Sequence, residues 1–188
     1  MAAMLTHSGG LYCVANIRGG GEFGEDWHKA AVREKRHVAF ADFEECARYL
    51  IREGWTRKEK LVCQGGSNGG ALVGAVMNRA GEELFAAGIA QVGYDLFCPS
   101  RLTEIRVLDL LRYHLFTIGY AWKPDYGDPG IKEDFEFIYK WSPYHNVRDG
   151  KNYQYPAILC ETSDHDDRVY RPSFFPPNLV FRCIRSSS

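Results

Sequence analysis

The segment Gly65–Gly70, which reads Gly-Gly-Ser-Asn-Gly-Gly, constrains the fold of this chain more than any other stretch. It follows a short apolar run at 61–63 and precedes a helical pattern at 71–77. A strand, a Gly-x-Ser-x-Gly motif and a helix in this order are typical of a nucleophile elbow, a sharp turn that exposes the serine hydroxyl. We expect Ser67 to have strained backbone angles and its flanking glycines to lie where a Cβ would clash. The alternative is a glycine-rich connection whose serine only caps a helix.

Apolar runs of strand length alternate with helical patterns along the chain, which predicts parallel βαβ units in an α/β sheet. The run at 11–17 is expected to be a strand buried on both faces, and further strands are expected at 86–92 and 157–160. Apolar residues recur at helical spacing from Phe40 to Ile51, with Gly54 as the stop. Because this helix is amphipathic, we expect it to cover one face of the sheet.

The bulk properties exclude several classes of protein. A length of 188 residues indicates one domain with a substantial core. With 23 basic and 24 acidic side chains the net charge is −1, so no nucleic acid partner is expected. No apolar run approaches a membrane span and the N-terminus does not read as a signal peptide, so we expect no membrane partner. The six cysteines lack CxxC spacing and suit free core thiols in a reducing compartment, which predicts a cytoplasmic protein.

A literal G-x-G-x-x-G at 19–24 follows the first apolar run and raises the question of a dinucleotide cofactor. The local chemistry argues against a cofactor, since Glu22, Glu25 and Asp26 would crowd the position of a pyrophosphate. No apolar helix starts after the motif, and Asp42 lies in a helical pattern rather than at a strand end. We therefore expect no bound cofactor.

A nucleophilic serine needs a base to take its proton and a carboxylate to orient that base. The acid candidate is the loop Asp164–Asp167, which follows the strand expected at 157–160. The loop is alternatively a solvated acidic turn, and a metal site is disfavoured because the ligands are adjacent and nothing else converges on them. No histidine follows Asp166, since the six histidines are His7, His28, His37, His114, His145 and His165. The residues alone leave the base unassigned.

Several collinear stretches of the chain resemble the prolyl oligopeptidase (prolyl endopeptidase) family, over about residues 9–169. They lie at 16–24, 27–29, 65–70, 90–93, 117–122, 142–147 and 164–169. Asn68 favours this family over its arginine-directed and acylaminoacyl relatives. The resemblance implies an α/β-hydrolase fold, a mostly parallel sheet with helices on both faces, which would be incomplete at both ends here. It also implies a β-propeller domain as the partner of that fold.

The resemblance further implies a serine endopeptidase that cleaves short proline-containing peptides after proline, through an acyl-enzyme. By position, Ser67 would be the nucleophile, Asp166 the acid of the triad, and the backbone N–H of Asn68 one donor to the oxyanion. Trp122 would stack on the proline ring of the substrate, because a flat aromatic suits a ring without polar groups. Arg168 would bind a peptide carbonyl by a charge-assisted hydrogen bond. Without the resemblance, Trp122 would be taken as a core aromatic residue.

The chain departs from the family pattern in ways that bear on activity. Residues 1–169 are expected to form a partial peptidase domain with an unusual insertion at 94–106, and residues 170–188 an aberrant, poorly ordered tail. The family's catalytic histidine, its propeller and the tyrosine that supplies a second oxyanion donor have no counterpart here. We therefore expect this chain alone to be inactive or nearly so. The alternative function is that of a non-catalytic truncated isoform or pseudoenzyme that acts by binding a partner.

Overall fold

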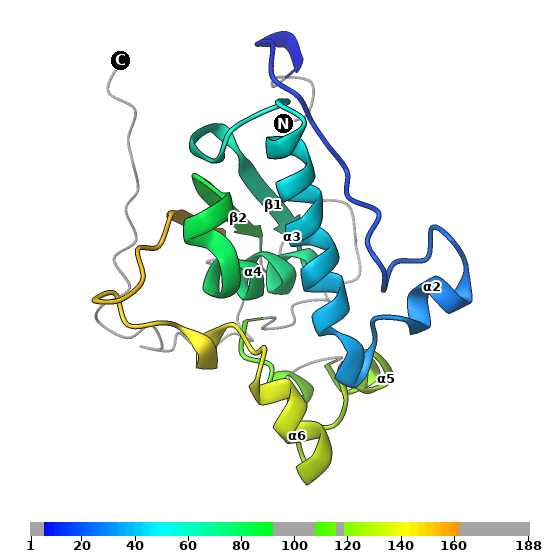
Figure 1. Cartoon of the computed structure of the whole chain (residues 1–188). Helices are drawn as coiled ribbons and strands as arrows, with labels where there is room; N and C mark the ends of the chain where they lie inside the picture. Colours follow the sequence, from blue (N-terminus) through cyan, green and yellow to red (C-terminus); the bar gives the residue numbers. More distant parts are fainter. Residues whose placement is uncertain (1–5, 92–107, 116–118, 162–188) are drawn as a thin grey trace.

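The computed structural model of the chain describes residues 6–91, 108–115 and 119–161 (Figure 1). The structure has two long helices, α3 (His37–Arg52) and α4 (Asn68–Leu84). Three shorter helices are α2 (Glu25–Lys29), α5 (Lys123–Tyr126) and α6 (Lys132–Tyr139). The strands are β1 (Val62–Gly66), β2 (Ala87–Gln91) and β3 (Ala157–Glu161). Short 3₁₀ helices lie at Arg33–Lys35 (η1), Lys58–Lys60 (η2), Tyr113–Leu115 (η3), Gly119–Trp122 (η4) and Tyr144–Asn146 (η5).

The three strands form one parallel sheet in the order β1-β2-β3. Their register is level, so that the carboxyl ends of the strands meet at Gly66, Gln91 and Glu161. The strands predicted around 61–63, 86–92 and 157–160 are therefore confirmed, as is the parallel α/β arrangement. Reactive groups of such sheets gather at the carboxyl edge, which is where β1 leads into α4.

The helix α4 connects β1 to β2 and packs on both strands, while α3 packs mainly against α4 (Figure 1). The side chain of Arg79 on α4 pairs with the buried Glu44 on α3 at 2.6 Å and lies over the ring of Phe40. The predicted amphipathic helix is thus confirmed, with α4 as its main helical neighbour, while its covering of a face of the sheet stays a prediction. Gly54 ends α3 as predicted, with φ of 74°.

The core lies between α4 and one face of the sheet. Strand residues on that face, such as Cys63, Gly88 and Ala90, are buried against α4. On the opposite face Val62 and Leu159 keep 49% and 46% of their surface exposed. Small residues at the buried positions let α4 approach the strands closely, which brings the start of the helix onto the end of β1.

The segment 11–17 is not a strand, so this prediction is wrong. Leu11, Tyr12 and Val14 are 61%, 51% and 73% exposed. The apolar composition gave the segment a strand-like pattern, but a strand also needs a neighbour to accept and donate its backbone hydrogen bonds. Among the described residues no strand pairs with this segment.

The remaining predictions concern the cysteines, a membrane span and three segments that lie outside the described residues. Cys63 is a buried free thiol whose pKa burial raises to about 12, whereas Cys13 and Cys46 are free but exposed, so they are not core residues as expected. Among the described residues, no helix has the length and apolar character needed to cross a membrane. The insertion at 94–106, the acidic loop at 164–167 and the tail at 170–188 lie outside the described residues.

Candidate active site

The candidate nucleophile Ser67 occupies the turn between β1 and α4 in a conformation that few side chains adopt. Its φ is 51° and its ψ is −117°, a strained combination for a residue with a Cβ. A Cβ on Gly65 would overlap the carbonyl group of Gly69, whose carbon would lie only 2.5 Å away. The backbone N–H of Ser67 donates to the carbonyl of Gln91 on the neighbouring strand at 2.8 Å, which anchors the turn to the sheet. The strain predicted from the motif is present.

The side chain of Ser67 makes no capping hydrogen bond with α4, and the residue is exposed. The first turn of the helix is closed instead by the Ser67 carbonyl, which accepts from the N–H of Gly70 at 2.8 Å and of Ala71 at 3.3 Å. The alternative that this serine only caps a helix is therefore wrong. The backbone N–H of Asn68 has no acceptor among the described residues, as expected for the first position of a helix. An exposed hydroxyl thus stands beside a free backbone donor.

The side chain of Asn68 is held from two sides. Its Oδ1 accepts a hydrogen bond from the guanidinium of Arg36 and another, at 2.6 Å, from the phenol of Tyr126. The Arg36 guanidinium also lies over the Tyr126 ring, 5.0 Å from its centre. Burial raises the pKa of Tyr126 to about 12, while the nearby Arg36 acts in the opposite direction, so the phenol remains a hydrogen-bond donor at neutral pH.

Trp122 belongs to a cluster of aromatic side chains that reaches the turn through Tyr126. The Trp122 and Tyr126 rings lie 6.3 Å apart at 33°, and Tyr126 further contacts Tyr113 at 5.4 Å and Trp141 at 5.8 Å. Tyr113 and Tyr126 are fully buried, but Trp122 is only half-buried. The structure therefore brings Trp122 and Asn68 to the two sides of one tyrosine and leaves part of the Trp122 ring accessible.

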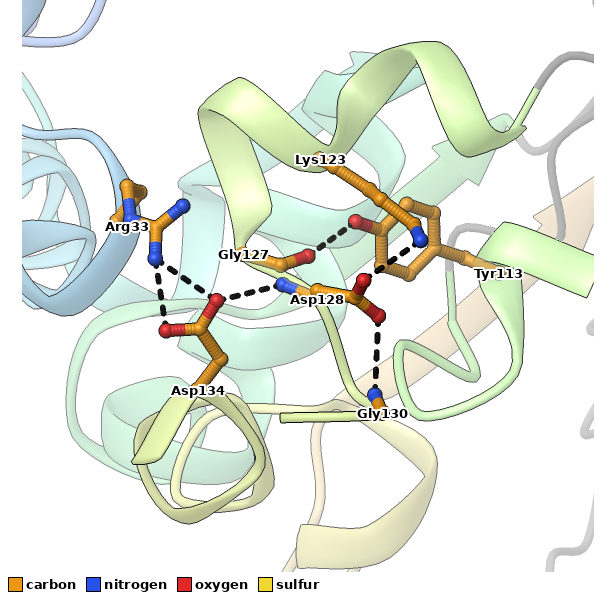
Figure 2. A network of polar contacts seen from close by, with 7 residues as sticks. All are labelled: Arg33, Tyr113, Lys123, Gly127, Asp128, Gly130 and Asp134. Atoms are coloured by element: carbon orange, nitrogen blue, oxygen red, sulfur yellow. Dashed lines mark hydrogen bonds and ion pairs between the residues drawn. The ribbon is translucent and has the colours of Figure 1, made fainter. Parts of the chain in front are cut away.

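A polar network fixes residues 119–142, which we call the aromatic segment, against η1 (Figure 2). Arg33 donates to both carboxylate oxygens of the buried Asp134, at 2.7 and 2.8 Å. Asp134 also accepts from the backbone N–H of Asp128 at 2.7 Å, and Asp128 in turn pairs with Lys123 at 2.6 Å. The hydrogen bond from Lys123 holds the pKa of Asp128 below its ordinary value. The network surrounds the turn that follows α5. The helix α5 carries Tyr126 and begins directly after Trp122.

A second group of Ser, His and Asp side chains lies in the interior, near α6, and differs from a catalytic triad. Ser142 Oγ and Asp109 Oδ1 both approach the same ring nitrogen, Nδ1 of His145, at 2.9 and 3.9 Å. Ser142 is fully buried, and its Oγ accepts from the N–H of Leu110 at 3.1 Å in addition to its hydrogen bond with His145. Burial lowers the pKa of His145. The group is a structural hydrogen-bond cluster, since a triad places the serine and the acid on different nitrogens.

Three of the five predicted site residues fall within the described residues. The structure places Asn68 directly after Ser67 and links it through Tyr126 to Trp122, whereas Asp166 and Arg168 lie outside the described residues. Within the described part, no group of three His, Cys, Asp or Glu side chains could hold a metal ion. Sequence reasoning missed Arg36 and Tyr126. Tyr126 follows Trp122 by four positions, a helical spacing that could have indicated the ring contact, but Arg36 stands in a basic run without any signal of its role.

The parallel sheet, the strained serine at the end of β1 and the helix that follows it define an α/β-hydrolase. The chain belongs to the prolyl oligopeptidase family, whose model matches residues 1–174. It is 47% identical over 161 residues to prolyl oligopeptidase A of Amanita bisporigera, covering 86% of this chain and 19% of that protein. To the prolyl endopeptidase of Dictyostelium discoideum it is 44% identical over 160 residues, covering 85% and 19%.

A solved structure gives the same assignment. Prolyl oligopeptidase B from Galerina marginata, bound to a 25-residue macrocyclization substrate, is similar with a TM-score of 0.66 and 41% identity, covering 77% of this chain and 18% of that one. The chain thus spans about a fifth of the length of the relatives it matches. The resemblance found from the motifs is confirmed at the level of the family and the fold.

Proposed function

We propose that Ser67 is the nucleophile of a serine endopeptidase that cleaves short peptides after proline through an acyl-enzyme. The observation that carries the proposal is the strained, exposed Ser67 beside the N–H of Asn68, which has no acceptor in the described part of the chain, at the start of α4. In acyl transfer the serine oxygen attacks the peptide carbonyl, and the carbonyl oxygen becomes negative. The Asn68 N–H is placed one residue beyond the nucleophile, where such an oxyanion develops in this fold.

The substrate proposal rests on Trp122 and on the relatives. A half-buried indole next to the turn offers a flat apolar wall to a proline ring. The relative from Galerina marginata was solved with a peptide substrate bound. In the proposed mechanism Asp166 orients the base and Arg168 binds a carbonyl of the peptide. A cytoplasmic location is also part of this proposal, and the free thiols support it.

A second candidate function is non-catalytic binding of a partner. The specific observation in its favour is that all six histidines precede Asp166, whereas the base follows the acid in the usual order of this fold. His28 and His145 are moreover engaged elsewhere, with Gly19 and Ser142. On this basis the second candidate is a chain in which Ser67 is not activated.

Labelling of the folded chain with a fluorophosphonate separates the two functions, because only an activated serine attacks the phosphorus, displaces fluoride and becomes phosphonylated. If Ser67 is the nucleophile, labelling should be lost in Ser67→Ala. It should be kept in Ser8→Ala, because Ser8 is an exposed serine far from Ser67 in the sequence. If the chain binds proline-containing peptides, such a peptide should compete with the probe and slow the labelling. The same peptide should slow the labelling of Trp122→Ala by a smaller factor. A folded chain that does not react with the probe contradicts the catalytic proposal and supports the binding function.

A further inference from the structure

Arg36 differs from the other arginines that form close contacts in this molecule. The residue is only 7% exposed, whereas the paired arginines Arg18, Arg33, Arg48 and Arg79 keep 33% to 42% of their side chains exposed. Each of those four pairs with a carboxylate. In the part of the chain that the structure describes, no carboxylate forms an ion pair with Arg36. Burying a cation is costly unless its contacts compensate for the lost water, so the contacts that Arg36 makes with the described residues require an explanation.

Those contacts converge on the residue after the candidate nucleophile. Arg36 donates to Oδ1 of Asn68, and its guanidinium lies 5.0 Å from the centre of the Tyr126 ring. Tyr126 donates to the same oxygen at 2.6 Å. A side-chain carbonyl has two lone pairs, and here both are occupied, so the Asn68 amide has one orientation. The three side chains form a closed triangle of two hydrogen bonds and one cation–π contact.

Fixing the Asn68 side chain also fixes its backbone. Asn68 is the first residue of α4, and the preceding Ser67 already has a strained φ of 51°. A peptide unit at such a turn could relieve strain by rotating, which would turn the Asn68 N–H away from the serine hydroxyl. Two donors that hold the Asn68 side chain oppose that rotation. They therefore keep the free N–H directed at the site.

We propose that Arg36 is a positioning residue for the reaction at Ser67: together with Tyr126 it holds Asn68, and through Asn68 the backbone donor to the oxyanion. The proposal rests on the proposed function of Ser67. It adds that the buried guanidinium supplies positive potential next to the group that binds a developing negative charge. The Tyr126 ring also contacts the Trp122 ring, with their centres 6.3 Å apart. Tyr126 therefore aligns the oxyanion donor of Asn68 with Trp122, the residue proposed to contact the proline ring.

The test compares Arg36→Met, which keeps a long apolar side chain, with Arg36→Lys, which keeps the charge but loses the planar fork of donors. The matched control is Arg148→Met, since Arg148 also lies over a tyrosine ring, that of Tyr153 at 4.6 Å, but has no contact with Asn68. Thermal unfolding confirms that each variant is folded. The readouts are the NMR signals and hydrogen exchange of the Asn68 backbone and side-chain amides, and the rate of fluorophosphonate labelling of the 188-residue chain.

We expect Arg36→Met to shift both Asn68 amides, to speed exchange of the backbone N–H, and to slow labelling by about 10- to 100-fold. The probe concentration at half-saturation should change little, because the defect lies in the reacting step. Arg36→Lys should recover part of the rate, and Arg148→Met should match the wild type. Unchanged Asn68 signals, or an unchanged labelling rate when the signals have shifted, would overturn the proposal.

Failure of the proposed function gives a different pattern. A wild-type chain that does not react with the probe contradicts the role of Ser67, whatever residue stands at position 36. The Asn68 signals then decide whether Arg36 holds this residue. If they move in Arg36→Met and not in Arg148→Met, the contact stands as a structural clamp, and if they do not move, the proposal is wrong.

Discussion

The elbow at 65–70 and the aromatic segment at 119–142 both lie at the candidate site, but they are built in different ways. The elbow is shaped by backbone groups that are close in sequence, such as the contact of Gly65 with Gly69. The aromatic segment is held by side chains from distant positions, and Arg33 and Asp134 are separated by 101 positions. Backbone sterics are specified by a short motif, whereas a side-chain network is specified only by the complete fold. The two regions should therefore respond differently to substitution.

The largest effect is expected at Gly65. A Cβ there would meet the carbonyl group of Gly69, which is backbone and cannot move aside without distorting the turn. We expect Gly65→Ala to lower the free energy of unfolding by about 3 kcal/mol or more, as measured by urea denaturation. Gly69→Ala is the matched control, because its Cβ would meet nothing within 4 Å. That variant should lie within about 1 kcal/mol of the wild type. Equal losses at the two glycines would contradict the steric account of the elbow.

A smaller effect is expected from the network that holds the aromatic segment. Arg33→Met leaves the buried carboxylate of Asp134 with only the N–H of Asp128 as a partner among those shown in Figure 2. We expect a loss of about 2 kcal/mol in the free energy of unfolding, moderated because the Arg33 side chain is 41% exposed. Arg48→Met, which removes the pairs with the exposed Glu45 and Glu83, should cost less than about 1 kcal/mol. If Arg33→Met lowered the free energy of unfolding no more than Arg48→Met does, packing other than this network would hold the aromatic segment.

The sequence predicted the elbow and the sheet because their signals are local. The glycines around Ser67, the apolar runs of β1, β2 and β3, and the stop at Gly54 each follow from a few adjacent residues. The prediction for 11–17 failed because the pattern of a strand does not include its neighbour. The roles of Arg36 and Tyr126 could not be predicted, since they depend on three elements that meet only in the folded chain. Trp122 was identified through family resemblance and not from its own spacing.

A substitution that removes the backbone strain at the elbow is expected to raise the free energy of unfolding, whereas the two preceding substitutions lower it. Ser67→Gly abolishes the clash between the Cβ and the backbone at φ of 51°, at the cost of greater freedom in the unfolded chain. We expect a net stabilisation of about 1 kcal/mol in urea denaturation, together with complete loss of probe labelling. Ser67→Ala keeps the Cβ and serves as the control, which should lose labelling without gaining stability. If both variants were equally stable, the strain would not be a significant term.

The smallest effect concerns pH and the interior cluster around Ser142. Burial lowers the pKa of His145 in the folded chain relative to about 6.5 in the unfolded one. Protons then bind first to the unfolded state, so this group leaves stability unchanged at pH 8 and reduces it as the pH falls below about 6.5, until the folded-state pKa is passed. His145→Asn keeps an acceptor for Ser142 and should flatten the decline measured between about pH 7 and 5. An unaltered slope would assign the decline to other groups.

The contacts of Asn68 also set an order of events during synthesis. A ribosome releases the chain from its N-terminus, so Arg36, 32 positions earlier, is already present when Asn68 emerges. Tyr126 follows 58 positions later and brings the second hydrogen bond. A nascent chain that ends before Tyr126 can form the elbow and its serine, but the neighbouring amide is held by one donor only. The geometry around Ser67 is therefore completed only after Tyr126 has been made, 58 positions after Asn68.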